Sequence, residues 1–160
     1  MKAISNISGV DPVRLGAANQ VMQTLTDLMA SHDLLEESRA KELGLNLAEA
    51  RLLLFFDDGK QHTVKHLAEI LNVTKGRITR ITDGLVKKKL VERVPDDFDG
   101  RVIRIKLTPS GEERLYDLKV KYWEAFDSIL ASLSFQKRMV IMAVLNEFSN
   151  CLRKLTEENE

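Results

Sequence analysis

The sequence has only one cysteine, Cys151, so no intramolecular disulfide can form and a reducing environment is expected. It has no run of 18 apolar residues, which argues against a helix that spans a membrane. The first nine residues lack the apolar core of a signal peptide. We therefore expect a cytoplasmic protein with no membrane partner.

Catalytic motifs are also missing from the sequence. There is no nucleophile–base constellation, no glycine-rich phosphate loop and no paired metal-ligand motif. We therefore expect no enzymatic activity, no metal and no cofactor. The lone Cys151 lies on the last predicted helix, near its apolar stripe. This position favours a buried, inert thiol over an oxidant sensor.

The net charge is zero, but the charge is unevenly distributed along the chain. Residues 60–109 hold twelve Lys and Arg against six Asp and Glu, whereas the rest of the chain holds twelve against eighteen. A basic middle between acidic arms favours one orientation of the molecule towards a polyanion such as a phosphate backbone. The alternative is a solvated cluster of charges without a partner.

Apolar periodicity and capping residues predict a mainly α-helical fold with a small β-hairpin. Residues 31–42 either continue the first helix or break it. The strands alternate apolar and cationic residues, as expected of a hairpin half buried on a small core. The predicted helices cover residues 12–31, 47–57, 63–71, 74–88, 110–131 and 134–155, and the predicted strands cover 91–94 and 102–107.

The helices over 63–71 and 74–88 are separated only by Asn72-Val73, so they form a helix-turn-helix. Ala68 supplies the small residue that the first helix needs where the second crosses it. Recognition helices read base edges in the major groove with residues near their N-terminal end. Arg can bind guanine bidentately, and Thr can contact bases or the thymine methyl. The predicted major-groove residues are Thr74, Lys75, Gly76, Arg77, Thr79 and Arg80.

A basic hairpin follows this motif at once, and its tip carries Asp99-Gly100-Arg101. Arg101 can enter a narrow minor groove, where the potential is most negative, and Asp99 can hold its guanidinium extended through a charge-assisted bond. Further cations would neutralise phosphates. The predicted phosphate contacts are Lys65, Lys87, Lys88 and Arg104.

The run from Leu45 to Gly111 resembles the MarR (multiple antibiotic resistance regulator) family of winged-helix transcription factors. The resemblance is carried by Leu67-Ala-Glu-Ile-Leu, Thr74-Lys-Gly-Arg-Ile-Thr-Arg-Ile-Thr-Asp-Gly-Leu and Asp99-Gly-Arg-Val-Ile-Arg-Ile-Lys-Leu-Thr-Pro-Ser-Gly. It implies a homodimer with interlocked terminal helices, a palindromic operator and, often, release by a small ligand between the dimerisation and DNA-binding regions. One departure is Gly76-Arg77, where the family commonly has two small polar residues.

The resulting expectation is a winged helix-turn-helix regulator of transcription. It would act as a repressor that a small-molecule effector releases from DNA. Residues 1–44 and 110–160 would supply dimerisation helices around a DNA-binding domain at 45–109. The rival interpretations are a winged-helix module that binds a protein partner without DNA, and a small-molecule carrier. His62 and His66, with His32, could form a metal site, but His62 precedes the helix cap, so surface or phosphate-neighbouring positions are favoured.

Overall fold

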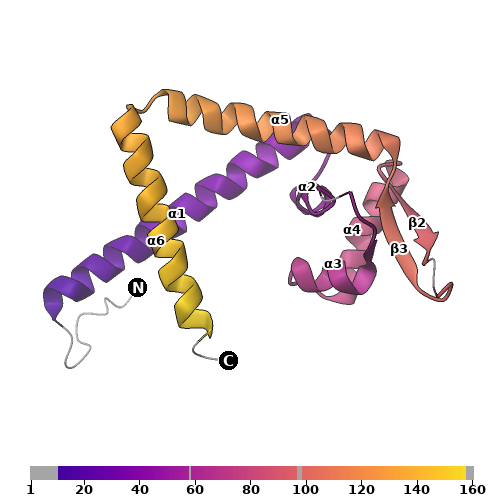
Figure 1. Cartoon of the computed structure of the whole chain (residues 1–160), viewed down its shortest axis with the longest axis horizontal. Helices are drawn as coiled ribbons and strands as arrows, with labels where there is room; N and C mark the ends of the chain where they lie inside the picture. Colours follow the sequence, from indigo (N-terminus) through magenta and orange to yellow (C-terminus); the bar gives the residue numbers. More distant parts are fainter. Residues whose placement is uncertain (1–10, 58, 97–98, 158–160) are drawn as a thin grey trace. The chain divides into compact units, whose positions relative to one another are not determined.

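The computed structural model describes residues 11–57, 59–96 and 99–157. The chain divides into two compact units, the first ending at Leu118 and the second beginning at Lys119. Helices predominate, and the strands form one small antiparallel sheet (Figure 1). In chain order the elements are α1 (Pro12–Glu42), α2 (Leu47–Leu54), β1 (His62–Thr63), α3 (Val64–Ile70), α4 (Lys75–Lys87), β2 (Val91–Pro95), β3 (Ile103–Leu107), α5 (Pro109–Ala131) and α6 (Phe135–Glu157).

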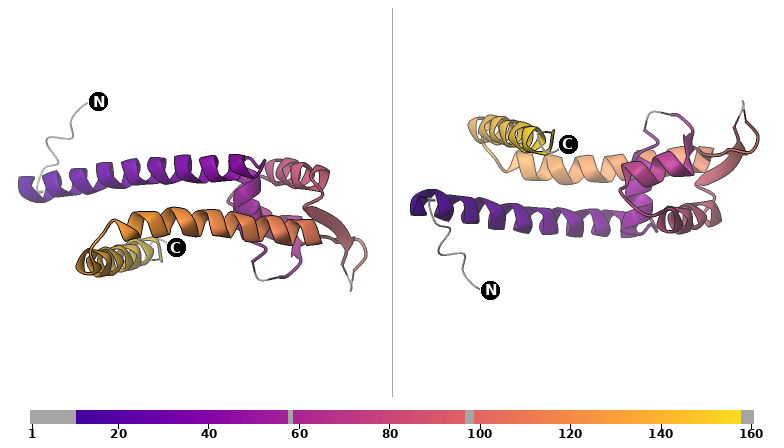
Figure 2. Two further views of the ribbon diagram at one scale, coloured as in Figure 1. Left: turned by 90° about the horizontal axis from the view of Figure 1, so that it is seen from above. Right: turned by 90° about the horizontal axis from the view of Figure 1, so that it is seen from below.

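The helix α1 is one continuous element through the stretch that the sequence left open. Its first turn is capped by the Asp11 carboxylate, which accepts the N–H of Val13 at 3.0 Å, and Pro12 occupies the first helical position. It ends before Gly44, which adopts a φ of +70° that favours glycine. Its N-terminal half extends past α2, α3 and α4 in both views of Figure 2.

The helix α2 begins with the predicted capping box. The Asn46 side chain accepts the N–H of Glu49, and the Glu49 carboxylate accepts the N–H of Asn46. The helix was predicted to reach residue 57, and this was wrong, because it ends at Leu54. Its last turn tightens, since the N–H groups of Phe55 and Phe56 bind carbonyls three residues back rather than four.

The sheet has three strands in the order β1-β3-β2, all antiparallel. The sequence predicted β2 and β3 but not β1, because a strand of two residues is too short to show any alternation. In β1, His62 lies opposite Ile105 of β3. Because β1 directly precedes α3, the pairing of β1 with β3 ties the sheet to the start of α3.

The core of the first unit lies between α2, α3, α4 and the sheet. Five apolar residues of the helix-turn-helix, Leu67, Leu71, Ile78, Ile81 and Leu85, have the spacing expected of its shared core, and Leu67, Ile78 and Leu85 are fully buried. The other two, Leu71 and Ile81, are only half-buried, because they line a hollow between helices. The other fully buried apolar side chains include Leu52, Leu53, Phe56, Ile105 and Leu118.

Two segments expose apolar side chains on a large scale. In the first unit, the N-terminal half of α1 exposes Val13, Val21, Met22, Leu28 and Met29. In the second, α6 has no buried residue at all within its described span. Its exposed apolar side chains include Phe135, Met139, Ile141, Met142, Leu145, Leu152 and Leu155.

None of the helices in the described residues alone combines the length and the apolar character that crossing a bilayer requires. Only α5 and α6 taken together, as a pair bent at the break between them, meet those two criteria.

Candidate nucleic-acid interface

The turn between α3 and α4 is built by local hydrogen bonds and one unusual backbone angle. Asn72 adopts a φ of +49°, a conformation that asparagine tolerates better than most residues. The N–H of Val73 returns to the carbonyl of Ala68 at 3.0 Å. The Thr74 hydroxyl then caps α4 by accepting the N–H of Arg77 at 3.3 Å. These bonds fix the start of α4 relative to α3.

The helix α4 has one apolar face and one polar face. Ile78, Thr82 and Leu85 are buried, and the Thr82 hydroxyl is satisfied by the carbonyl of Ile78 at 2.7 Å. The predicted major-groove residues emerge opposite them. Thr79 is half-buried and donates to the carbonyl of Lys75, and the exposed members are Thr74, Lys75, Gly76, Arg77 and Arg80.

The cations on this face of α4 differ from several arginines elsewhere in the first unit in having no counter-charge among the described residues. Within the described part of the chain, Lys75, Arg77 and Arg80 have no ion pair. By contrast, Arg51 and Arg93 are bound to carboxylates. The exposed face of α4 therefore presents uncompensated positive charge on a rigid element.

The hairpin of β2 and β3 is joined to α4 and closed by its own ion pair. The Arg93 guanidinium binds Asp83 of α4 at 2.6 Å. Arg104 of β3 binds Asp96, whose other oxygen accepts the N–H of Asp99 at 3.0 Å. The wing therefore has a defined base, and its position relative to α4 is fixed by a charge-assisted bond.

Asp99 does not hold the Arg101 guanidinium in the way predicted. Its carboxylate instead accepts the backbone N–H of Arg101 at 3.0 Å, as in an Asx turn. The short Asp side chain reaches the backbone two residues ahead more readily than the end of an Arg side chain. Arg101 is exposed, and its guanidinium has no partner among the described residues.

The four predicted phosphate contacts have different surroundings. Lys65 makes only a loose pair with Glu69, at 3.8 Å, and Lys87 has no partner within the described ranges. Arg104 is bound to Asp96 and to the carbonyl of Gln61. Lys88 is held by Glu49 and Gly44 inside the first unit. Of the four predicted phosphate contacts, Lys65 and Lys87 are thus the two exposed side chains that no close internal bond holds, so they are available for a phosphate.

A hollow of about 570 Å³ lies beside the start of α4. Its wall includes the guanidinium-bearing residues Arg51 and Arg77, which belong to α2 and α4. The volume is that of a pocket for a small organic molecule. Its apolar lining consists of Leu47, Ala48, Leu71, Val73 and Ile81.

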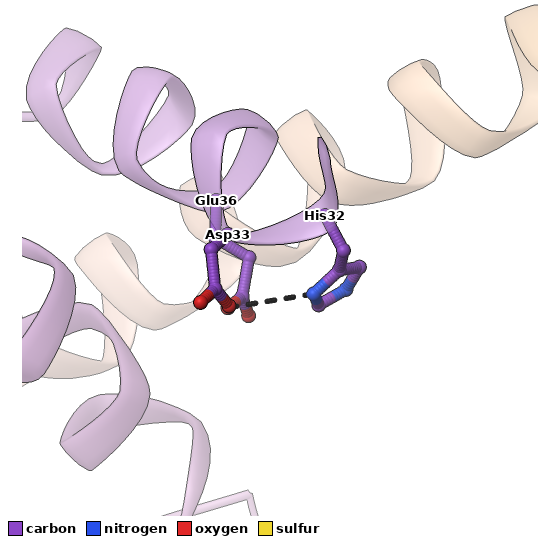
Figure 3. Close-up of side chains that lie close together, drawn as sticks. All are labelled: His32, Asp33 and Glu36. Carbon is purple, nitrogen blue, oxygen red and sulfur yellow. Dashed lines mark ion pairs between the residues drawn. The ribbon is translucent and has the colours of Figure 1, made fainter. Parts of the chain in front are cut away.

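The three histidines do not come together. The rings of His62 and His66 stack with their centres 5.3 Å apart, and His62 also contacts Phe56 edge-on. His32 lies on α1, where Nδ1 is 3.7 Å from Glu36 and where Asp33 projects to the same side (Figure 3). The ligand atoms of His32, Asp33 and Glu36 lie within 4.8 Å of one another, as in a metal site.

Arg51 already occupies the two carboxylates of this cluster. It binds Glu36 through Nε at 2.9 Å and Nη2 at 2.6 Å, and it also binds Asp33. The hydrogen bond that Arg51 donates to Glu36 raises the pKa of the Arg51 guanidinium above its ordinary value, and burial opposes this. A cation that the protein itself supplies therefore neutralises the acidic pair and joins α2 to α1.

Cys151 is exposed in the single chain, so the prediction of a buried thiol was wrong. The prediction took the apolar stripe of α6 as a sign of burial, whereas none of its residues is buried in one protomer.

Residues 43–102 match the model of the MarR family. The match begins before α2 and ends just before β3, and it includes every predicted groove contact.

Two curated proteins of Bacillus subtilis (strain 168) are similar to part of the chain. The HTH-type transcriptional regulator YpoP is 36% identical over 86 residues, which is 54% of this chain and 60% of YpoP. The HTH-type transcriptional repressor YetL is 28% identical over 106 residues, which is 65% of this chain and 64% of YetL. The matches thus span slightly less than two thirds of these relatives.

Solved structures share the fold over a longer stretch. Wild-type MarR of E. coli, in its apo form, superposes with a TM-score of 0.71 over 79% of this chain and 93% of that chain, at 22% identity. This likeness in fold, with the helices and the small antiparallel sheet, confirms the predicted fold class.

Sequence reasoning missed two features that hold the interface in place. One is the Arg51 bridge to α1, and the other is the burial of Glu49 beneath α4. The only sequence signal for Glu49 was its capping box, which is equally compatible with an exposed side chain.

Proposed function

We propose that this protein is a sequence-specific regulator of transcription that binds double-stranded DNA and represses by occupying an operator. The observation that carries the proposal is the exposed face of α4, where Lys75, Arg77 and Arg80 have no counter-charge within the described residues. Such cations gain free energy by releasing counterions from phosphates, and an arginine at a helix N-terminal end can read guanine. The names of YpoP and YetL support the same class of activity.

The regulator acts as a homodimer on a palindromic operator. The apolar surface on α1 and α6 supports this part of the proposal, because a monomer rarely leaves so much apolar surface in water. A symmetric dimer would present two copies of α4 about 34–36 Å apart, one turn of DNA, to successive major grooves.

A small effector releases the regulator from DNA. The hollow beside α4 supports this, because Arg77 belongs both to its wall and to the exposed face of the helix. A small organic molecule with an apolar body would match the apolar lining, and an acidic group on it would pair with the Arg77 guanidinium, since Arg51 is already bound to Glu36 and Asp33. Binding there would engage Arg77 and withdraw a cation from the DNA interface.

Selection of duplexes from a random-sequence pool tests the function. We expect the full chain to enrich a palindromic site, and its affinity to fall steeply as salt rises. A winged-helix module that binds only a protein partner would enrich no sequence and would show little affinity for any duplex. Such a result would refute the proposal.

A further inference from the structure

A buried carboxylate lies directly beneath α4. Glu49 is only 3% exposed, although capping boxes normally form at solvent-exposed helix ends. Its Oε2 accepts the N–H of Asn46 at 2.9 Å and the ammonium of Lys88 at 2.5 Å. A charge removed from water is costly unless it is paired and hydrogen-bonded, and here both conditions are met.

The helix α4 is shaped to admit this carboxylate. Gly84 lies within the helix, where glycine is a poor choice for stability. A Cβ at this position would lie 2.5 Å from Oε1 of Glu49, which is closer than a Cβ approaches any non-bonded atom, so the Glu49 side chain would have to shift. Glycine at 84 therefore lets α4 sit against the Glu49 side chain while that side chain keeps its two bonds.

Lys88 closes the contact at the C-terminal end of α4. Its ammonium donates to the Glu49 carboxylate and, at 2.7 Å, to the carbonyl of Gly44 in the turn between α1 and α2. Two of its three N–H groups are thus used inside the protein. Lys87, the preceding residue, is exposed and has no such partner among the described residues.

We infer that Glu49 and Lys88 are positioning residues, which fix the direction of α4 so that its other end meets base edges in register. This inference rests on the proposed DNA binding. The helix has 13 residues and is about 20 Å long, at about 1.5 Å per residue. A small tilt at the pinned end therefore displaces Arg77 and Arg80, whose hydrogen bonds to bases demand close alignment.

Positioning and phosphate binding predict different behaviour in solution. A phosphate contact strengthens binding to every sequence and steepens the salt dependence, whereas a positioning residue affects only the sequence that needs correct geometry. Adjacent Lys87 offers a matched comparison, because it carries the same charge at the same end of the helix without the internal bonds.

The test compares Lys88→Met, Glu49→Gln and Lys87→Met. The probes are a duplex enriched by the wild-type protein from a random pool and a scrambled duplex of the same composition. Affinities for both are measured at several salt concentrations, at a temperature where circular dichroism shows every variant to be fully folded. Glu49→Gln keeps an oxygen for the capping box and removes only the charge.

We expect Lys88→Met and Glu49→Gln to lose about ten-fold or more in affinity for the enriched duplex, with scrambled-duplex affinity and salt slope unchanged. The double variant should be no worse than either single one, because both single substitutions remove the same ion pair. Lys87→Met should weaken both duplexes equally and reduce the salt slope by about 1.8 per bound dimer, which is about 0.9 for each of its two Lys87 side chains.

Two results would overturn the positioning role alone. One is a Lys88→Met variant that behaves like Lys87→Met, which would make Lys88 a phosphate contact. The other is a folded Lys88→Met variant with wild-type affinity for both duplexes, which would make the pair purely structural. A wild-type protein that enriches no duplex would instead overturn the proposed function, and this role with it.

Discussion

At the scale of single residues, Arg101 tests the wing. It is exposed on the hairpin, its backbone is held by Asp99, and its guanidinium has no partner within the described residues. We expect Arg101→Ala to weaken binding of an enriched duplex by about ten-fold or more, because a minor-groove arginine would be lost. Fluorescence anisotropy measures the affinity, and an unchanged thermal transition shows that folding is intact.

Lys106 of the same hairpin provides the control for this prediction, since it too is exposed and without a partner in the described part of the chain. Lys106→Ala removes the same charge and should have a clearly smaller effect. Equal losses for the two variants would mean that the wing contributes only general positive charge.

Gly111 is a second residue with a specific physical requirement. A Cβ there would overlap the backbone carbonyl of Leu90 and would lie 3.1 Å from the Leu107 side chain. Because the backbone cannot move aside cheaply, we expect Gly111→Ala to lower the free energy of unfolding by about 1–3 kcal/mol. Urea titration followed by circular dichroism measures this change.

The matched control is Gly16 of α1, where a Cβ would meet nothing within 4 Å. Gly16→Ala should leave stability unchanged or raise it by up to about 1 kcal/mol, since alanine is the better helix former. Destabilisation by both substitutions to the same extent would contradict the close approach of α5 to Leu90.

At the scale of elements, the start of α2 depends on one side chain. Asn46 accepts the N–H of Glu49 and so satisfies a donor that the helix leaves open. We expect Asn46→Ala to cost about 1 kcal/mol of stability, and Asn46→Ser to cost much less, because serine also caps well. Equal unfolding midpoints for the alanine and serine variants in urea would show that the cap is unimportant.

The helices of this protein could be predicted well because their boundaries are encoded locally. The first four helices begin within one residue of their predicted starts, and each is capped by a side chain next to that start, from Asp11, Asn46, Thr63 and Thr74. The misplaced end of α2 and the missed strand β1 have a common cause: both depend on hydrogen bonds that few local residues specify.

The candidate site was predictable to a lesser degree. The outward face of α4 follows from helical periodicity, so the exposure of Arg77 and Arg80 could be foreseen. The internal bonds of Lys88 and Arg104 could not, because Glu49 and Asp96 reach them only through the tertiary fold. A run of three lysines at 87–89 looks uniform in sequence, although its members have different surroundings.

At the scale of the whole molecule, α6 provides the clearest test of dimerisation. Leu152 is 48% exposed in the single chain and belongs to the apolar stripe of this helix. We expect Leu152→Asp to raise the dissociation constant of the homodimer about thirty-fold or more, because a charge would be buried in the interface, at a cost of about 2 kcal/mol. Sedimentation equilibrium measures the change.

Asn150→Asp adds the same charge to the opposite face of α6 and should leave the dimer intact. A Leu152→Asp variant that remains as dimeric as Asn150→Asp would place the subunit interface elsewhere.

Because no described residue of α6 is buried in a single chain, the proposed dimerisation would make control of transcription depend on the concentration of the protein. If this helix finds its apolar contacts only in a second subunit, the competent form assembles by a bimolecular reaction. Its abundance then rises with the square of the protomer concentration while most copies remain single. A modest drop in protein synthesis would therefore lower the occupancy of the operator more than proportionally. The promoter would then respond to protein concentration with a threshold.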